Sequence, residues 1–301
     1  MNLVTIKKIA IFGANGHIAK NIIYYFLQQE NVELYLFTTN KSKCQNFINS
    51  LKQNNYNYKI KVYEQFNLYK YDCIINCIGL GTFRKDFNFT NYFKVIEYYD
   101  NLIISYLQKH STCNYINMSS GAVHKEIHIN DFKVEDIYTI TKLNSEYKHR
   151  TYGNLKIIDL RIYSFFSRFA DIENDNYFIN EIINCILKNK EFNTTTDNII
   201  RDFIHPVDFM NIIKECIQMQ NNCFFEIGTK DNISKNEILN YFQQNYNLKI
   251  NYTNEINYNT LSGSKLQYYP EIISNKFNIQ YSSLDTIKSE SDYLLNSKIG
   301  E

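Results

Sequence analysis

The 301-residue sequence predicts an α/β protein of the Rossmann type, a doubly wound parallel sheet with a smaller mixed α/β C-terminal substrate domain. Three observations carry this prediction. Short apolar segments alternate with longer amphipathic ones through the first half, the first apolar segment ends in a glycine-containing turn that opens a helix pattern, and the rhythm changes after about Ser164. Such alternation is typical of parallel strands joined by crossover helices.

Six short apolar segments in the first half are expected to be strands. They are KIAIFG, VELYLFT, KIKVYEQ, CIINCIG, CNYINMSS and LKIIDLRIYS. Between them, apolar residues recur every three or four positions in four segments that are expected to be helices, at 17–29, 41–53, 89–109 and 136–151. This order of elements predicts the doubly wound sheet.

The second half has a different pattern. Helices are expected at YFINEIINCILKNKEF and VDFMNIIKECIQMQ with an Asn- and Thr-rich loop between them, then a strand at CFFEIG and a helix at NISKNEILNYFQQNY that Ser234 and Glu237 begin with a capping box. The last fifty residues or so are weakly patterned and carry no predicted element. We expect a dinucleotide-binding domain at 1–164, to which 200–228 returns, and a substrate-binding domain at 165–199 and 229–301.

The charge balance excludes some partners. With 32 Lys and Arg against 31 Asp and Glu, there is no global electrostatic attraction to nucleic acid or to an anionic membrane, so an anionic ligand needs a local site. No apolar run approaches the roughly 20 residues of a membrane helix, and the apolar stretch near the start is too short for a signal peptide.

Seven cysteines without a CxxC pair indicate a reduced, cytoplasmic location. The six histidines are not accompanied by a cluster of acidic residues or cysteines, so no metal site is expected.

The turn after the first strand, GANGHIA, places Gly13, Gly16 and Ala19 at intervals of three. Glycine permits the tight turn and a close approach of the backbone to a pyrophosphate, and a small third residue lets the helix pack near the sheet. The spacing is GxxGxxA rather than GxGxxG, and an ordinary strand-to-helix turn remains the alternative.

The end of the second strand favours NADP over NAD. An acidic residue there binds the ribose hydroxyls of NAD, but this chain has none in LFTTNKSK. The hydroxyl, amide and ammonium groups suited to a 2′-phosphate are those of Thr38, Asn40, Lys41 and Lys43. NAD stays open as the alternative cofactor, because lysines at a helix start are often only solvated.

A proton-transfer pair follows the fifth strand. Tyr138 and Lys142 are four residues apart on one predicted helical face, and Ser120 ends the strand before that helix. An ammonium group one turn away is expected to lower the pKa of the phenol toward neutrality, which would let Tyr138 exchange a proton. A plain helix-surface pair is the alternative, but the order of phosphate turn, serine strand end and Tyr-Lys helix favours the catalytic interpretation.

Further segments extend the pattern over nearly the whole chain: INCIG, MSSGAV, YTITKLNSE, LRIYSFFS, RDFIHPVDF and FFEIG. With GANGHIA, they make the chain resemble an extended short-chain dehydrogenase/reductase of the NAD-dependent epimerase/dehydratase family, whose members modify nucleotide sugars. The resemblance implies that Ser120 binds the substrate oxygen, that Tyr138 is the acid-base, and that Lys142 holds the nicotinamide ribose.

The resemblance also implies binding residues. The implied cofactor residues are Gly13, Asn15, Gly16, His17, Ile18, Cys77 and Gly79, and the implied substrate residues are Ser119, Ser164 and Arg201. An arginine suits a substrate diphosphate because its guanidinium binds two oxygens at once. His205 and Asp208 are expected to be structural.

Departures from the family pattern limit what the resemblance implies. Ala19 stands for the last glycine, His124 for a tyrosine, and Ser164 and Ser167 for Asn and Gly, which leaves the sugar open. Where a dehydratase of this family has a carboxylate pair just after the catalytic serine, this chain has Gly121 and Ala122, so a 4,6-dehydratase is disfavoured.

Two enzymatic hypotheses and one other remain. The first is an NADPH-dependent reductase that acts on a nucleotide-linked keto-sugar at C4, and the second is an NAD-dependent nucleotide-sugar 4-epimerase. A non-catalytic dinucleotide-binding protein is the third, because a fold does not imply a function. The resemblance further implies a homodimer through helices 89–109 and 136–151. The nucleotide, the sugar and the stereochemistry of the product are not fixed by the sequence.

Overall fold

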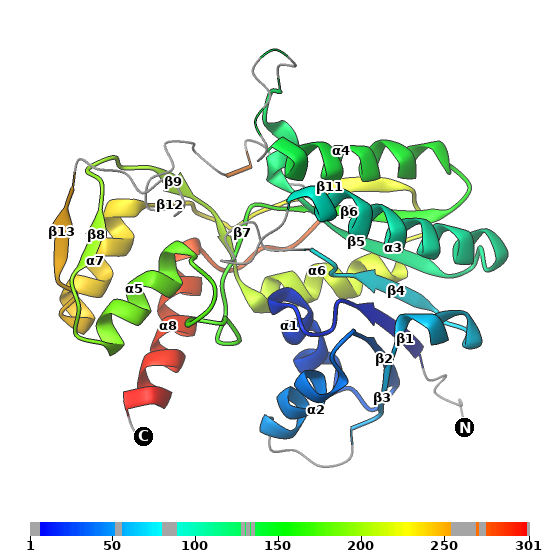
Figure 1. Cartoon of the computed structure of the whole chain (residues 1–301), viewed down its shortest axis with the longest axis horizontal. Coiled ribbons are helices and arrows are strands. Elements are labelled where there is room, and N and C mark those ends of the chain that lie inside the picture. Colours follow the sequence, from blue (N-terminus) through cyan, green and yellow to red (C-terminus); the bar gives the residue numbers. More distant parts are fainter. Residues whose placement is uncertain are drawn as a thin grey trace. The chain divides into compact units, whose positions relative to one another are not determined.

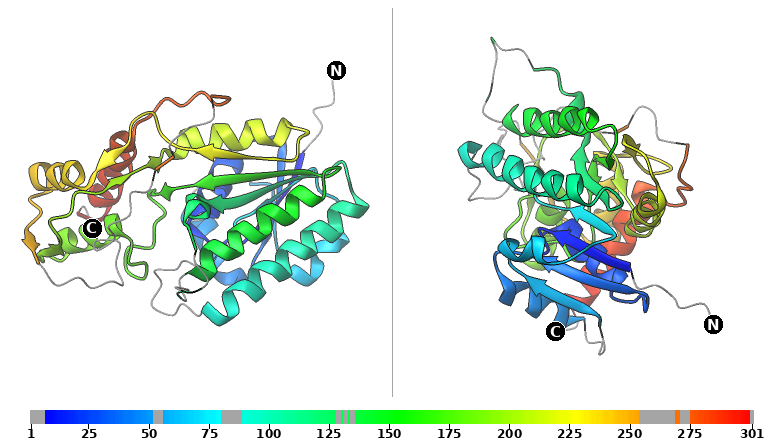
Figure 2. Two further views of the ribbon diagram at one scale, coloured as in Figure 1. Left: turned by 90° about the horizontal axis from the view of Figure 1, so that it is seen from above. Right: turned by 90° about the vertical axis from the view of Figure 1, so that its right-hand side faces the viewer.

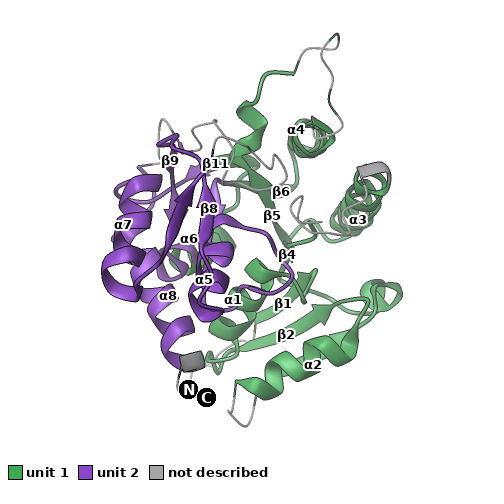
Figure 3. Ribbon diagram, turned by 60° about the vertical axis from the view of Figure 1, so that its left-hand side comes forward, with its two compact units in different colours: residues 1–79, 89–161, 210–225 green, residues 80–88, 162–209, 226–301 purple. Residues whose placement is uncertain are grey.

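The computed structural model describes residues 7–51, 56–79, 89–127, 130, 133, 136–253, 269–270 and 275–299. The chain packs as two compact units (Figure 3). Unit 1 comprises 1–79, 89–161 and 210–225, and unit 2 comprises 80–88, 162–209 and 226–301. Each unit is therefore assembled from three segments that are distant from one another in the sequence.

A seven-stranded sheet forms the centre of unit 1, with the strand order β11-β6-β5-β4-β1-β2-β3 (Figure 1). Its strands are β1 (Lys7–Phe12), β2 (Val32–Phe37), β3 (Tyr58–Lys61), β4 (Cys73–Asn76), β5 (Asn114–Ser120), β6 (Lys156–Ile162) and β11 (Cys223–Ile227). β1 pairs in parallel with both β2 and β4. The order of strands therefore reverses beside β1, and in doubly wound sheets ligands bind at the carboxyl ends of the strands at this switch point.

Helices cover both faces of the sheet (Figure 2). α3 (Phe89–Lys109) and α4 (Asp136–Thr151) pack side by side on one face. On the other face, α1 (His17–Phe26) contacts both α2 (Lys41–Ser50) and α6 (Pro206–Gln218), since Lys20 lies over the ring of Phe47 and Lys214 over the ring of Tyr25. The predicted Rossmann-type α/β class is confirmed, and α3 and α4 have the predicted bounds.

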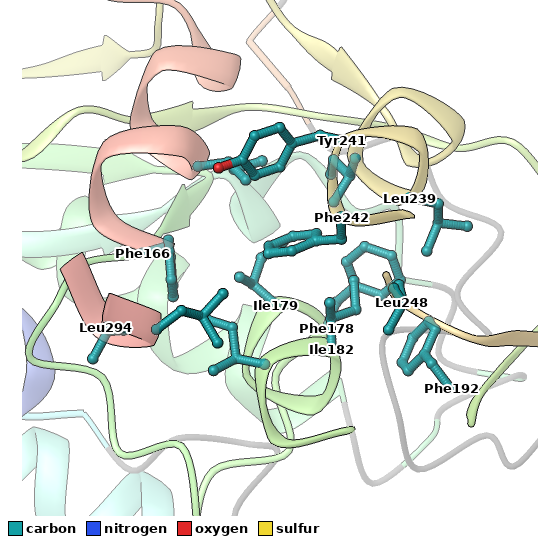
Figure 4. Close-up of a cluster of buried hydrophobic side chains, with 14 of the residues drawn as sticks. Phe166, Phe178, Ile179, Ile182, Phe192, Leu239, Tyr241, Phe242, Leu248 and Leu294 are labelled. Carbon is teal, nitrogen blue, oxygen red and sulfur yellow. The ribbon is translucent and has the colours of Figure 1, made fainter. Parts of the chain in front are cut away.

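In unit 2, the described residues form three helices around an apolar core and several short two-stranded ribbons. Its helices are α5 (Phe178–Leu187), α7 (Lys235–Tyr246) and α8 (Ser283–Ile299), and its strands are β7 (Ser164–Phe165), β8 (Phe192–Thr194), β9 (Ile200–Arg201), β10 (Phe203–Ile204), β12 (Ile233–Ser234) and β13 (Ile250–Tyr252). Phe178, Ile182, Phe242 and Leu294 share the core between the helices (Figure 4).

The capping box predicted at the start of α7 is confirmed. The Ser234 hydroxyl accepts a hydrogen bond from the backbone N–H of Glu237, and the Glu237 carboxylate accepts one from the N–H of Ser234. These two bonds satisfy N–H groups that the first turn of a helix cannot pair internally.

One predicted strand has the wrong bounds, and one helix was not predicted. The strand expected at 59–65 stops at Lys61, and Tyr63–Leu68 forms a 3-10 helix in which Phe66 is buried. The last fifty residues contain the 17-residue helix α8, whose buried face includes Ser283, Thr286, Glu290 and Ser291. Because polar residues are buried there, the helix lacks the apolar stripe that a sequence search needs.

Within the described ranges, no helix combines the length and the apolarity that crossing a bilayer requires.

Candidate functional site

The turn between β1 and α1 is built around Gly13, whose φ is +72°. A Cβ at this residue would lie 2.9 Å from the carbonyl oxygen of Cys77, and one at Gly16 would lie 3.2 Å from the carbonyl oxygen of Gly13. α1 begins at His17 with Gly16 at its N-cap and with no acidic residue in its first turn. The two glycines therefore let the backbone approach a phosphate group closely, and the start of α1 offers that group the partial positive charge of a helix N-terminus. Both features fit a dinucleotide.

Backbone bonds fix the turn to the sheet. The N–H of Ala14 donates to the carbonyl of Phe37 at 3.1 Å, and that of Gly16 donates to the carbonyl of Gly13 at 2.8 Å. Ala19 is fully buried, and such a small side chain lets α1 pack close to the strands. His17 and Ile18, which follow in the first turn of α1, supply the backbone N–H groups nearest to the turn.

A second turn, between β2 and α2, is shaped by its own polar side chains. The Asn15 amide donates to Thr38 Oγ1 at 2.6 Å and to the carbonyl of Asn40 at 2.9 Å. Asn40 caps α2 by accepting the N–H of Lys43 at 2.9 Å. Thr38 is buried, whereas Lys41 and Lys43 are exposed. Of the four residues predicted to bind a 2′-phosphate, Thr38 and Asn40 therefore shape the turn. Lys41 and Lys43 expose their ammonium groups to solvent.

The end of β4 faces the same edge of the sheet. The Asn76 amide donates to the Tyr115 hydroxyl at 3.0 Å, and its oxygen accepts the N–H of Ile78 at 3.0 Å. Cys77, through its carbonyl, closes one side of the Gly13 turn. A Cβ on Gly79 would meet nothing within 4 Å, so nothing in the described contacts requires glycine there.

Ser120, Tyr138 and Lys142 come together in unit 1. Ser120 ends β5 and caps a 3-10 turn at Gly121–His124, while Tyr138 and Lys142 lie on α4. The Tyr138 phenol is hydrogen-bonded to the Ser120 side chain, and Lys142 Nζ lies 5.9 Å from the centroid of the Tyr138 ring. Ser119, the neighbour of Ser120, donates its hydroxyl to Glu146 at 2.5 Å instead.

The expectation that Lys142 lowers the pKa of Tyr138 is wrong. Burial raises the pKa of Tyr138 above its ordinary value, and the opposing influence is the hydrogen bond with Ser120. The Lys142 ammonium donates to the carbonyl of Met118 at 2.6 Å. Burial also lowers the pKa of Lys142 to about 8, against the attraction of Asp159, Asp100 and Glu146.

A buried group of charges behind this site was not anticipated from the sequence. The fully buried His149 of α4 bonds to Asp159 of β6 through Nδ1 and to Asp100 of α3 through Nε2, each at 2.9 Å. Tyr115 of β5 donates to Asp100 at 2.7 Å, and Asn117 donates to Asp159 at 2.7 Å. We call these five residues the His149 network; it joins α3, α4, β5 and β6.

The His149 network holds its charges by mutual attraction. Burial lowers the pKa of His149, but Asp159 and Asp100 outweigh burial and raise it to about 9. Burial raises the pKa of Asp100, but His149 and Lys148 outweigh burial and lower it to about 2. His149 is therefore an imidazolium at neutral pH. Its spacing of seven residues from Lys142, two helical turns, was the only sequence signal that could have linked it to the site.

In unit 2, Arg201 is buried in β9 opposite Ile233 of β12, and Ser164 lies half-buried in β7. His205 stacks on Tyr281 at 3.9 Å between ring centroids, and Asp208 accepts the backbone N–H groups of Gln280 and Tyr281. These contacts hold the chain segments together. No group of three His, Cys, Asp or Glu side chains among the described residues is arranged to hold a metal ion.

A Rossmann-type sheet with serine, tyrosine and lysine gathered on β5 and α4 places the chain in the class of extended short-chain dehydrogenases/reductases. The family comparison agrees. Residues 9–228 match the model of the NAD dependent epimerase/dehydratase family, and the chain belongs to that family. A comparison with curated proteins found no match.

Solved structures share the fold over almost their whole length. The dTDP-glucose 4,6-dehydratase of Bacillus anthracis, in complex with NAD, has a TM-score of 0.76 at 14% identity, with 97% of this chain and 98% of that chain covered. The UDP-glucuronic acid 4-epimerase of Bacillus cereus, in complex with UDP-glucuronic acid and NAD, has a TM-score of 0.77 at 17% identity, with 96% and 99% covered. At these identities the likeness establishes the fold.

Proposed function

We propose that the protein is an NADPH-dependent reductase of a nucleotide-linked keto-sugar, with the ketone at C4. The observation that carries the proposal is the contact of the Tyr138 phenol with Ser120 beside the buried Lys142 ammonium. Reduction of a carbonyl to an alcohol requires a proton donor and groups that stabilise the negative charge that develops on the oxygen. A neutral phenol with a hydroxyl and a nearby cation can supply both.

The chain's residues fit a nicotinamide dinucleotide. Gly13, Gly16 and the first turn of α1 would hold the pyrophosphate, and Lys41 and Lys43 would neutralise a 2′-phosphate. When bound, the cofactor supplies the hydride. NADP is preferred to NAD because residues 38–43 contain no carboxylate that could accept ribose hydroxyls.

The side chains of unit 1 then do the proton chemistry. Ser120 holds the substrate oxygen, Tyr138 gives that oxygen its proton, and Lys142 stabilises the phenolate that is left. The preference for reduction rests on residues 38–43, which contain no carboxylate, and on the minimal set of Ser120, Tyr138 and Lys142, which suffices for hydride transfer with one coupled proton.

A nucleotide-sugar 4-epimerase with NAD is the second candidate. Its chemistry would use the same three residues in both directions, and the fold likeness to the Bacillus cereus 4-epimerase supports it. For either reaction we place the sugar nucleotide with unit 2, as the substrate-binding domain. Arg201 would meet the diphosphate there, and Ser164 and Ser119 are further candidate substrate contacts.

We also propose a homodimer through α3 and α4. Both helices leave large aromatic side chains exposed, Tyr98 of α3 by 64% and Tyr147 of α4 by 71%. Exposed aromatic residues are enriched at protein interfaces. Light scattering at micromolar concentration would show the dimer mass, and a monomer would contradict this interface.

The function is tested by binding and turnover of the whole protein. A thermal-shift panel of nucleoside-diphosphate sugars with NADPH and with NADH should show stabilisation by NADPH and by one nucleotide class. The preferred 4-keto-sugar should then be reduced as NADPH absorbance falls. Stoichiometric NAD retained through purification, with interconversion of 4-epimers, would instead establish the epimerase, and no dinucleotide binding at all would refute both.

A further inference from the structure

The side chain of Tyr63, which follows β3, extends past β2 to the switch point beside β1. Tyr63 is the first residue of the 3-10 helix after β3, yet its ring crosses the carboxyl ends of the neighbouring strands. The ring centroid lies 6.1 Å from that of Phe37 at the end of β2 and 5.2 Å from that of Phe12 at the end of β1. It lies 4.3 Å from Tyr99 of α3. Aromatic contacts on three sides therefore fix the direction of the phenol.

The Tyr63 hydroxyl is bound to the phosphate turn itself. It accepts the backbone N–H of Gly13 at 3.1 Å. Since a phenol oxygen also carries one hydrogen, the bond to Gly13 leaves that hydrogen available as a donor. Tyr63 is half-buried, and no acceptor for its O–H is found within the described stretches of the chain. The donor is thus held beside Gly13 without a protein partner there.

The surroundings keep this phenol neutral. Burial raises the pKa of Tyr63, the Gly13 bond opposes that effect, and the nearby Tyr99 phenol and Cys77 thiol add to it. A neutral hydroxyl is a hydrogen-bond donor over the whole physiological pH range. Cys77 directly follows β4, and Gly13 directly follows β1. The Tyr63 hydroxyl, bonded to Gly13, therefore lies at the carboxyl ends of these neighbouring strands, where parallel sheets of this kind bind their ligands.

We propose that Tyr63 is a cofactor-binding residue whose hydroxyl, oriented by the Gly13 N–H, donates a hydrogen bond to a ribose or phosphate oxygen of the ADP half of the dinucleotide. The inference rests on the proposed use of a nicotinamide dinucleotide. It adds a ligand contact from the β3 end of the sheet, a region that glycine spacing and the Tyr-Lys helix do not reach.

The test removes one oxygen atom and measures binding of fragments. Tyr63→Phe keeps the ring and its aromatic contacts, and it should weaken binding of ADP-ribose to the full-length protein about three- to tenfold, the usual effect of one hydrogen bond. Binding of nicotinamide mononucleotide, which lacks the ADP half, should stay within about twofold of the wild type. Isothermal titration gives both constants without any turnover.

Tyr99→Phe is the matched control, because it removes the hydroxyl of the neighbouring ring, which has no described bond to the turn. It should leave ADP-ribose binding unchanged. The proposal is overturned if Tyr63→Phe binds ADP-ribose as the wild type does, if Tyr99→Phe loses as much, or if affinity for nicotinamide mononucleotide falls equally, since that marks a general distortion. A wild-type protein that binds no ADP-ribose refutes the proposed cofactor, whereas a wild type that binds with an unaffected Tyr63→Phe refutes this inference alone.

Discussion

The two ends of the unit 1 sheet are held together by different forces. Around β1, β2 and β3, the interior is aromatic: Phe12, Phe37 and Phe66 pack within 4.8 to 5.5 Å of one another, centroid to centroid. Around β5, β6, α3 and α4, the interior contains the His149 network of buried charges. The end of the sheet where we propose cofactor binding, which we call the cofactor end, therefore depends on shape and backbone geometry. The end where we propose catalysis, which we call the catalytic end, depends on paired charges that respond to pH.

The largest effect is expected at the catalytic end, from Tyr138→Phe. Losing the proton donor should lower keto-sugar turnover about 10²- to 10⁴-fold, while affinity for the dinucleotide should stay the same because the phosphate turn is untouched. Steady-state kinetics and titration with NADPH measure the two quantities. If the variant turns over substrate at the wild-type rate, Tyr138 is not the acid.

His149→Leu should lower the free energy of unfolding by about 3–5 kcal/mol, because Asp100 and Asp159 lose the buried cation between them. Urea denaturation at pH 7 measures the loss. Phe66→Leu, in the aromatic interior, removes part of an apolar contact only and should cost about 1–2 kcal/mol. Equal losses would mean that the two ends do not differ as we infer.

The same contrast predicts a pH dependence of stability. The pKa of His149 is raised from 6.5 to about 9, so the folded state binds its proton more tightly than the unfolded state does. The contribution of His149 to the free energy of unfolding is complete below pH 6.5 and is lost as the pH rises through 9, by roughly 3 kcal/mol. The lowered pKa of Lys142 acts the opposite way above pH 8. The difference in stability between wild type and His149→Leu therefore isolates His149, and a difference that does not shrink toward pH 9 contradicts the assignment.

At the cofactor end, Gly13→Ala should weaken dinucleotide binding at least tenfold. An alanine at φ +72° costs about 1–2 kcal/mol, and its Cβ would meet the Cys77 carbonyl at 2.9 Å. Gly153→Ala is the control, because a Cβ there meets nothing within 4 Å. Titration with NADPH distinguishes them, and equal affinities would show that the turn does not hold the cofactor.

The smallest effect concerns the two exposed lysines of α2. Lys43→Ala should weaken NADPH binding about two- to fivefold, the usual size of one surface charge near a phosphate, and should leave NADH binding unchanged. Parallel titrations with both cofactors measure the ratio. A variant that loses NADH and NADPH affinity equally would speak against a 2′-phosphate site at this turn.

Local patterns in the sequence were enough for the main architecture. The alternation of apolar and amphipathic segments predicted β1, β2, β4 and β5 within three residues at each end, because strand and helix periods are properties of neighbouring residues. Ser120, Tyr138 and Lys142 could be singled out for a similar reason, since four-residue spacing places Tyr138 and Lys142 on one face of a helix. The helix α8 was missed, although Ser282 and Asp285 bond reciprocally at its start and give a short capping signal.

The sequence by itself determined the alternating α/β order, the glycine turn and the residues available for proton transfer, because each depends on neighbours a few positions apart. Only the tertiary structure showed that Tyr63 bonds to Gly13, 50 residues away, and that His149 lies between Asp100 and Asp159. It also showed that burial raises the pKa of Tyr138. Burial and the pairing of distant charges are set by packing, and no local pattern records them.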